Sequence, residues 1–291
     1  MPPVHRSVVY EWLRHDKKFP HVWCPGCGLG ILLGSLLRSL AVSGLDKNQV
    51  VLVSGIGCSG RLPVYVDVGS VHTTHGRALT FATGIKLAKP EMHVITVMGD
   101  GDATAIGGNH LIHAARRNLD ITALIVNNQT YGMTGGQYSP TTPLGARATT
   151  APYGHIEPAF DISALSATAG ASFVARSTVY HVTQLDQLLG LAIAKRGFSV
   201  VEVLSPCHTN FGRQNRLGSQ VDMMKDYKAR GVRMERWKKM DESKRKGRFP
   251  LGVLVDRELP LFEDHYRRIC QEAALLRRGK SSDAGRQEGC S

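Results

Sequence analysis

Apolar residues follow two patterns along this chain. Short runs that are apolar at nearly every position, such as VVLVS and ITALIVN, are typical of strands buried on both faces of a sheet. Longer stretches, in which apolar residues recur every three or four positions, indicate helices packed on that sheet. The strands are expected at 50–54, 93–98, 121–127, 172–175 and 199–204. The helices are expected at 28–42, 78–89, 103–117, 161–169 and 183–195.

The alternation of strands and helices predicts the fold class. It indicates an α/β fold, with a parallel sheet that has helices on both faces, over residues 1–215. Beyond residue 215 the strand pattern fades. We expect a basic, largely helical extension over 216–280, packed on the same subunit or on a partner, and a disordered tail over 281–291.

Composition narrows the class of protein. The 291 residues are 42% apolar, which is enough for a real core. The N-terminus lacks the layout of a secretory signal, and the most apolar stretch, 31–45, is too short and too polar to span a bilayer. These features predict a soluble, cytoplasmic protein with no membrane contact. Six cysteines in such a protein indicate metal ligands or free thiols rather than disulfides.

The positive charge is concentrated in one segment. The chain carries a formal charge of +12, and 225–248 alone has eleven Lys and Arg residues against four Asp and Glu residues. A solvated basic helix is the simplest interpretation, and a docking face for an acidic partner or an anionic ligand is the functional one. No recognised nucleic-acid-binding motif is present, so no nucleic-acid partner is expected.

Polar residues follow two of the predicted strands at the point where each strand ends. Gly99, Asp100 and Gly101 leave one strand, and Asn127 and Asn128 leave the next. Each group alone is a common turn. Together, on adjacent parallel strands, they bring Asp100 and Asn128 side by side, and their oxygens suit Mg²⁺. The glycines let the backbone approach a diphosphate, whose charge is favoured by the following helix N-terminus.

This pattern resembles the thiamine diphosphate-binding motif of thiamine diphosphate-dependent enzymes. On that resemblance Asp100 and Asn128 are Mg²⁺ ligands, and the backbone carbonyl of Thr130 is the third. The residues expected around the cofactor are Gly57, Cys58, Ser59, His75, Gly99, Asp100, Gly101, Asp102, Asn128, Tyr131, Gly132, Met133 and Thr134.

Four of the six cysteines lie in loops rich in Gly, Pro and Ser. Cys24 and Cys27 lie in WCPGCG, Cys58 in GIGCSGR and Cys207 in SPCHT. Such loops are able to wrap a metal centre, and four thiolates suit either a tetrahedral Zn²⁺ or a [4Fe–4S] cluster. Buried, inert thiols are the alternative, and they fit these surroundings poorly.

Taken together, these loops resemble the β subunits of the 2-oxoacid:ferredoxin oxidoreductases over roughly residues 19–215. The resemblance implies thiamine diphosphate, Mg²⁺ and one [4Fe–4S] cluster held by Cys24, Cys27, Cys58 and Cys207. It implies that the cofactor accepts the electrons left by CO₂, that the cluster passes them singly to ferredoxin, and that coenzyme A takes the acyl group. Zinc has no redox chemistry and would serve none of these steps.

Only the diphosphate-binding half of such a site is visible in the sequence. The resemblance therefore implies an obligatory α subunit that supplies the activating glutamate and most of the coenzyme A site. The expected assembly is a heterodimer or a dimer of heterodimers.

The substrate is suggested by Arg61, which follows Cys58 by three residues. Its cationic fork suits the second carboxylate of a dicarboxylic acid, although a surface or phosphate-binding arginine is nearly as good an interpretation. His75 is a candidate polar group beside the reacting carbon, although a lone histidine is more often structural. Tyr131 and Met133 are expected to shape the cavity. Arg61 and the YGMTGGQYSPTT loop look most like the 2-oxoglutarate enzymes of the family.

The expected reaction therefore converts 2-oxoglutarate and coenzyme A to succinyl-CoA and CO₂, in either direction. The main alternative is an enzyme for pyruvate or for a broad range of 2-oxoacids. A non-redox thiamine diphosphate decarboxylase would leave the four loop cysteines unexplained. A zinc-binding nucleic-acid module would leave the paired strand-end turns unexplained.

Overall fold

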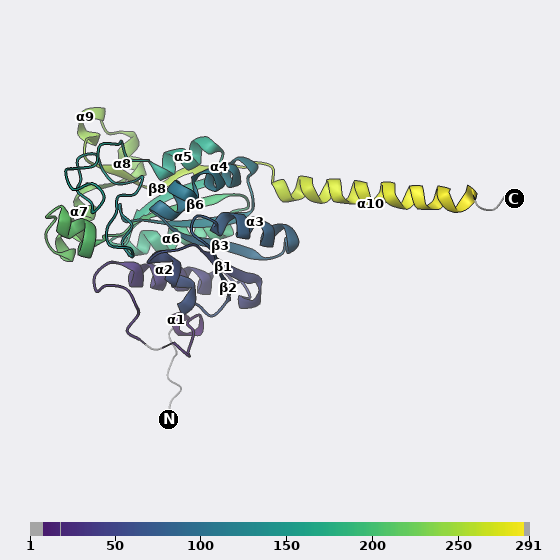
Figure 1. Ribbon diagram of the computed structural model, residues 1–291, viewed down its shortest axis with the longest axis horizontal. Coiled ribbons are helices and arrows are strands. Elements are labelled where there is room, and N and C mark those ends of the chain that lie inside the picture. The colour runs from purple at the N-terminus through teal and green to yellow at the C-terminus, as the bar shows by residue number, and fades with distance from the viewer. Residues whose placement is uncertain (1–7, 18, 288–291) are drawn as a thin grey trace, which may run out of the picture.

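The structure is a computed structural model that describes residues 8–17 and 19–287. Its strands are β1 (Val50–Ser54), β2 (Gly69–His72), β3 (His93–Gly99), β4 (Ile121–Asn127), β5 (Phe173–Thr178), β6 (Ser199–Leu204), β7 (Gly231–Arg233) and β8 (Phe249–Asp256). They form one eight-stranded sheet in the order β2-β1-β3-β4-β6-β5-β8-β7 (Figure 1). Neighbouring strands are parallel, except that β8 runs antiparallel to β5.

Helices cover both faces of this sheet. The helices of the described residues are α1 (Val8–Glu11), α2 (Leu29–Val42), α3 (Ala78–Ala88), α4 (Gly108–Arg117), α5 (Ile162–Ala169), α6 (Val182–Ala194), α7 (Gln220–Arg230), α8 (Met234–Lys238), α9 (Glu242–Arg245) and α10 (Phe262–Gln287). Shorter helical turns are η1 (Lys47–Gln49), η2 (Ser59–Tyr65), η3 (Asp102–Ile106) and η4 (His208–Gly212). Helices α2 and α6 lie on one face, and α3, α4 and α5 on the other.

Each face has its own apolar core. On the first face, the α2 side chains Leu32, Leu36 and Leu40 recur every fourth residue and are fully buried beside Leu185 of α6. On the second face, the core includes Leu111 of α4. Full burial of one such side chain stabilises the fold by about 1.5–3 kcal/mol. These two cores fix the sheet, and with it the loops at the carboxyl ends of its strands.

The predicted α/β fold is confirmed. Every helix and strand that the hydrophobic pattern predicts is present, with ends displaced by a few residues, but the pattern predicts neither α1 nor β2. Two further differences are larger. The helix expected over 103–117 is divided into the wide turn η3 and the helix α4. The basic region after residue 215 contributes β7 and β8, so the sheet is not wholly parallel. Antiparallel strands at one edge of an otherwise parallel sheet are common, but the basic residues before β8 and Pro250 within it mask its signal in the sequence.

Helix α10 projects from the body of the molecule and continues to Gln287 (Figure 1). It therefore occupies part of the segment for which the sequence predicts disorder, and the rest of that segment, 288–291, lies outside the described residues. Within the part of the chain that the structure describes, no helix is long and apolar enough to cross a membrane.

Candidate functional site

The loops that the sequence singles out leave four neighbouring strands at one edge of the sheet. Strands β1, β3, β4 and β6 are consecutive neighbours, and all four are parallel. The carboxyl ends of parallel strands meet at one edge, which is where ligands bind in open α/β sheets. The GIGCSGR, GDGDA, NNQTYG and SPCHTNFG segments therefore surround one region.

Asp100 and Asn128 lie on adjacent strand ends and line the same cavity, of about 190 Å³. Asp100 is 2% exposed, and its Oδ2 accepts a 2.7 Å hydrogen bond from Ser139 and another from Thr141. Burial raises the pKa of Asp100, although these hydroxyls oppose the rise. A divalent cation beside this carboxylate would favour its charged form.

The turn that carries Asn128 has a tightly defined backbone. Gln129 adopts a left-handed conformation with φ 63°, and the backbone N–H of Thr130 donates to Asn128 Oδ1 at 3.3 Å. The Thr130 hydroxyl donates to the backbone carbonyl of Gln137 at 2.7 Å. This hydrogen bond uses the side chain of Thr130 and not its backbone carbonyl, which is the group expected at the metal. Carboxylate, amide and carbonyl oxygens are the hard ligands that Mg²⁺ prefers. These residues fit the predicted magnesium site.

Gly101 permits a close approach that no other residue would allow. A Cβ at this position would lie 2.4 Å from the ring of Tyr131, and the Tyr131 hydroxyl donates to the Gly101 carbonyl at 3.3 Å. Burial, together with the nearby acidic groups Asp100 and Asp102, raises the pKa of Tyr131 to about 12. The phenol therefore stays protonated and ties the two strand-end turns together.

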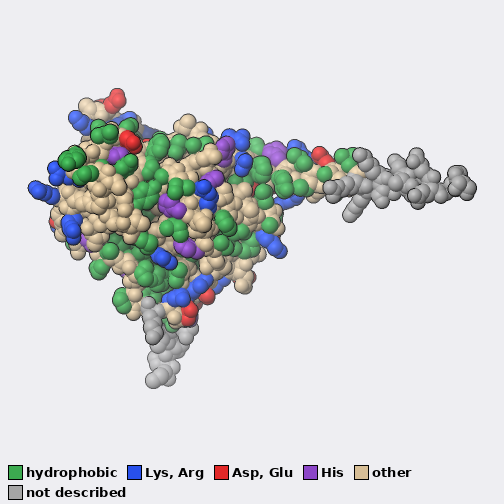
Figure 2. All heavy atoms as spheres, viewed as in Figure 1, with side chains coloured by type: hydrophobic (Ala, Val, Ile, Leu, Met, Phe, Trp, Pro, Cys, Tyr) green, Lys and Arg blue, Asp and Glu red, His purple; other side chains and the backbone are tan. Residues whose placement is uncertain are grey.

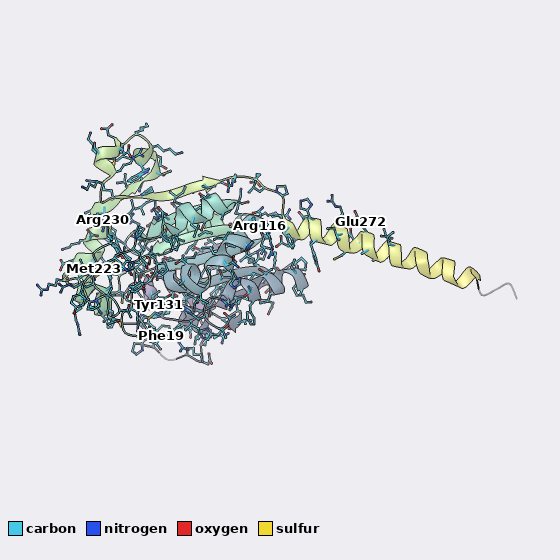
Figure 3. All side chains as sticks on the ribbon, turned by 45° about the horizontal axis from the view of Figure 1, so that its top comes forward. Phe19, Arg116, Tyr131, Met223, Arg230 and Glu272 are labelled. Carbon is cyan, nitrogen blue, oxygen red and sulfur yellow. The ribbon has the colours of Figure 1, made fainter. Side chains whose placement is uncertain are left out.

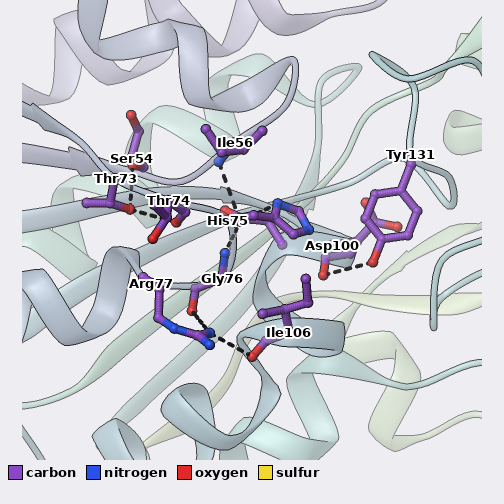
Figure 4. Close-up of polar contacts among 12 residues, drawn as sticks. Ser54, Ile56, Thr73, Thr74, His75, Gly76, Arg77, Asp100, Ile106 and Tyr131 are labelled. Atoms are coloured by element: carbon purple, nitrogen blue, oxygen red, sulfur yellow. Dashed lines mark hydrogen bonds and ion pairs between the residues drawn. The ribbon is translucent and has the colours of Figure 1, made fainter.

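Asp102 connects three loops around this cavity, and its partners Ile56, His75 and Gly76 are labelled in Figure 4. Its Oδ1 accepts a 2.6 Å hydrogen bond from the Gly76 N–H and lies 3.0 Å from His75 Nδ1. A Cβ on Gly55 would lie 1.8 Å from Asp102 Oδ2, so only glycine fits there. Burial raises the pKa of Asp102, and the hydrogen bond from the Gly76 N–H and the charge of His75 oppose this rise. Asp102 thus holds His75 at the cavity wall.

All the residues expected around the cofactor lie at this cavity. Its wall includes Ile56, Gly57, Cys58, Ser59, His75, Gly99, Asp100, Gly101, Asp102, Asn128, Thr130, Tyr131, Gly132, Met133 and Thr134. The predicted set is therefore brought together in space. Its roles toward a cofactor are taken up below as proposals.

The four loop cysteines line a second, adjoining cavity of about 560 Å³. Cys207 is buried, Cys27 and Cys58 are partly buried and Cys24 is exposed, and all four are free thiols. The Thr209 hydroxyl lies 3.7 Å from Cys24 Sγ and 4.0 Å from Cys207 Sγ, which links two of the loops.

The electrostatics of these cysteines also show that they are close together. Burial raises the pKa of the Cys58 thiol to about 11, and repulsion from Cys207, Cys27 and Cys24 adds to the rise. Burial likewise raises the pKa of Cys27. Burial and repulsion thus favour the thiol form of Cys27 and Cys58, and a cationic centre beside them would be needed to hold them as thiolates.

The spacing of the cysteines bears on the choice of metal centre. Among residues 8–17 and 19–287, no three His, Cys, Asp or Glu side chains are grouped closely enough to hold a single metal ion. The metal centre expected at Cys24, Cys27, Cys58 and Cys207 therefore stays a prediction.

The two cavities share a wall. Cys58, Asn128, Gly132 and Met133 line both of them. A Cβ at Gly132 would lie 3.3 Å from Cys207 Sγ and 3.8 Å from Cys58 Sγ, so the loop passes directly over two of the cysteines. A ligand on the Asp100 side would therefore lie beside Cys58 and be separated from Cys24, Cys27 and Cys207 by one layer of residues.

Arg61 lies at the cysteine cavity and not at the smaller one. Its side chain is exposed, and in the described part of the chain it forms no ion pair. The rim around both cavities also exposes large apolar side chains, namely Val22, Ile56, Val64 and Met133.

Several supporting residues were missed at the sequence level. Ser139 and Thr141 reach Asp100 across 39 and 41 positions, and the Trp23 indole donates to the Cys58 carbonyl at 2.7 Å. The hydroxyl-rich YSPTTP segment was the one available signal for the first two.

A buried network holds the asparagine turn from beneath. Glu202, which is 2% exposed, accepts hydrogen bonds from Asn127 at 2.8 Å, Ser163 at 2.6 Å and Arg176 at 2.8 Å. Asn127 in turn accepts from the Gln129 N–H at 3.2 Å. The network therefore positions the turn that carries Asn128.

Glu202→Gln removes the buried one of the two carboxylates that pair with Arg176, while keeping the shape of the side chain. We expect a loss of about 3 kcal/mol in the free energy of unfolding, because the buried Arg176 loses its buried partner and keeps only the half-exposed Asp161. The measurement is urea unfolding of the purified chain. As a control, Asp186→Asn breaks the half-exposed pair with Arg38 and is expected to cost about 1 kcal/mol. Equal losses in the two variants would contradict the special role of the Glu202 network.

Comparisons with known proteins agree with this geometry. Residues 26–203 match the C-terminal TPP-binding domain of thiamine pyrophosphate enzymes. The chain is 48% identical to the 2-oxoglutarate synthase subunit KorB of Methanothermobacter marburgensis over 257 residues, which are 88% of this chain and 90% of the relative. It is 44% identical to the subunit of that name in Methanocaldococcus jannaschii over 262 residues, 90% of this chain and 97% of the relative.

A solved structure shares the fold as well. The 2-oxoglutarate:ferredoxin oxidoreductase from Magnetococcus marinus, with 2-oxoglutarate, coenzyme A and succinyl-CoA bound, superposes with a TM-score of 0.81 at 30% identity. The match covers 94% of this chain and 93% of that one.

Proposed function

Because the chain belongs to the thiamine pyrophosphate enzymes, and within them to the family of the 2-oxoglutarate synthase KorB subunits, we propose that it is the β subunit of a 2-oxoglutarate:ferredoxin oxidoreductase. The reaction converts 2-oxoglutarate, coenzyme A and two oxidised ferredoxins to succinyl-CoA, CO₂, two reduced ferredoxins and a proton. The observation that carries this proposal is the shared wall between the Asp100 cavity and the cysteine cavity.

The smaller cavity suits thiamine diphosphate with Mg²⁺. Asp100, Asn128 and the Thr130 carbonyl would hold the metal, and the glycines at 99 and 101 leave room for the diphosphate. When bound, the cofactor supplies an electron sink for decarboxylation of a 2-oxoacid. His75, whose Nδ1 faces Asp102, would keep its other ring nitrogen for exchanging a proton with a ligand.

The cysteine cavity suits a [4Fe–4S] cluster held by Cys24, Cys27, Cys58 and Cys207. The mutual repulsion of these thiolates would be relieved by the iron. Because one layer of residues separates the two cavities, electrons would have a short path from one to the other. This path favours a redox enzyme over a non-redox decarboxylase.

The apolar rim supports an obligatory α subunit. A surface of Val22, Ile56, Val64 and Met133 suits a permanent interface, whose centre is apolar and poor in charge. Such a partner would close the cavities against water and supply the remaining half of the cofactor site and most of the coenzyme A site.

The proposed function is tested by anaerobic purification with the co-expressed partner. A brown protein, whose spectra show an organic radical on addition of 2-oxoglutarate and a reduced cluster thereafter, supports it. A colourless protein with stoichiometric zinc, despite adequate iron, would instead indicate a non-redox thiamine diphosphate enzyme.

Arg61 is the proposed partner of the second carboxylate of 2-oxoglutarate. Arg61→Ala is expected to lower kcat/KM for 2-oxoglutarate about 10- to 100-fold, because a charged hydrogen-bonded pair is lost. Pyruvate, which lacks the second carboxylate, is the matched control, and its kcat/KM should change less than about twofold. The two constants are measured by dye reduction. Equal losses for both substrates would contradict this role.

A further inference from the structure

One surface of the molecule carries cations that the chain itself does not neutralise. We define the basic face as Lys225, Lys228, Arg233, Arg236, Lys238, Lys239, Lys246 and Arg248. All eight are exposed, and within the described residues none forms an ion pair. Figure 2 shows Lys and Arg side chains gathered at the end of the molecule that carries α7, α8 and α9.

The basic face has an ordered support. Arg230 donates to the Gly247 carbonyl at 2.6 Å and stacks on Phe249, which ties α7 to the strand β8. Arg245 stacks on Trp237 and donates to its carbonyl at 3.1 Å, which ties α9 to α8. The cations are therefore displayed on a fixed surface rather than on a loose segment.

Four of these cations also rim a hollow. Lys228, Arg233, Arg236 and Arg248 line a recess of about 600 Å³. Glu235 also lines this recess, so four cations face one carboxylate. The excess of positive charge attracts an oppositely charged partner.

The basic face is continuous with the wall of the cysteine cavity. Met223, in the first half of α7, packs with Cys207 and Phe211 in one apolar cluster. A Cβ on Gly26, between Cys24 and Cys27, would lie 2.5 Å from the side chain of Gln220, the first residue of α7. Figure 3 shows Met223 and Arg230 on the same side of the molecule as Tyr131. Helix α7 thus reaches from the cysteine loops to the cations.

We propose that the basic face is the docking surface for a small, acidic iron–sulfur electron carrier, which takes electrons from the cysteine cavity across the first turns of α7. This inference rests on the proposed function, in which electrons leave through that cavity. Electron transfer weakens steeply with distance, so a carrier must dock close to the cysteines. Unneutralised surface charge speeds the encounter of transient partners without holding them permanently.

The alternative occupant of this face is the α subunit. The composition of the two surfaces indicates which partner binds to each. The cavity rim is apolar, which suits the permanent interface with the α subunit, whereas the basic face is charged and solvated, which suits a transient partner. A permanent partner on the basic face would have to desolvate eight cations.

The test reverses two cations, Lys225→Glu with Lys238→Glu, in the enzyme assembled with its partner subunit. Neither side chain forms an ion pair or an aromatic contact within the described chain, so the fold should tolerate the change. We expect kcat/KM for a purified acidic [4Fe–4S] ferredoxin to fall about tenfold at low ionic strength, and the wild-type salt dependence to flatten. Binding of oxidised ferredoxin, measured by calorimetry, should weaken in parallel. Reduction of methyl viologen should stay unchanged.

The matched control is Lys89→Glu with Arg116→Glu, which makes the same charge change at the ends of α3 and α4. It should leave ferredoxin reduction as in the wild type. Unchanged ferredoxin kinetics in the basic-face variant, or an equal loss in the control, would overturn the proposal. So would dissociation of the α subunit from the basic-face variant. A wild-type enzyme that reduces neither acceptor would instead overturn the proposed function.

Discussion

Asp100→Ala is expected to abolish Mg²⁺-dependent binding of thiamine diphosphate and to lower turnover more than about 1,000-fold, because the cofactor supplies the chemistry. Asp100 is the one carboxylate proposed for the metal, and it is 2% exposed at the cavity wall. The neutral ligands Asn128 and the Thr130 carbonyl would not neutralise the cation on their own. Binding of thiamine diphosphate is measured by near-ultraviolet circular dichroism while Mg²⁺ is titrated into the protein.

The same change has a second consequence. Because burial raises the pKa of Asp100, its charge opposes folding when no cation is present. The cofactor-free Asp100→Ala variant should therefore be no less stable than the cofactor-free wild type. Asp186→Ala, which changes a half-exposed carboxylate on α6, is the control and should bind thiamine diphosphate normally. Retention of the cofactor by Asp100→Ala would contradict the metal assignment.

The sequence predicts the parts of the site that depend on local pattern. Buried strands are recognised from their continuous apolar runs, and parallel strands place their carboxyl ends together. The positions of Asp100, Asn128 and Cys58 at one edge of the sheet therefore follow from the order of the elements alone. Adjacent strands β3 and β4 then bring the first two to one cavity.

The remaining parts depend on contacts that no local pattern encodes. Ser139 and Thr141 reach Asp100 from a loop without regular structure, and Glu202 holds Asn127 from 75 positions away. The antiparallel strand β8 follows a basic segment whose charges conceal its apolar run. Such contacts are determined by how distant elements pack, which requires the three-dimensional structure.

Cys207→Ser is expected to remove the iron–sulfur chromophore and to lower the rate of ferredoxin reduction more than about 100-fold. Mutation of a residue that only hydrogen-bonds to a metal ligand already lowers metal affinity or activity about 10- to 100-fold, and loss of a ligand itself should lower it further. A serine hydroxyl is a harder and far less acidic group than a thiol, so it is a poor ligand for iron. Thiamine diphosphate should still bind, because Cys207 lines the larger cavity and not the smaller one. The measurements are iron and cofactor content per chain and the visible absorption spectrum.

Cys270→Ser is the matched control, because Cys270 is an exposed free thiol on α10 and lines neither cavity. It should leave iron, cofactor and activity unchanged. Cys207→Ser and Asp100→Ala should then produce opposite patterns, with one losing iron and keeping the cofactor and the other losing the cofactor and keeping iron. If Cys207→Ser lost both groups, the two cavities would have to depend on each other. If it lost neither, the cluster would have to be held elsewhere, for example by the partner subunit.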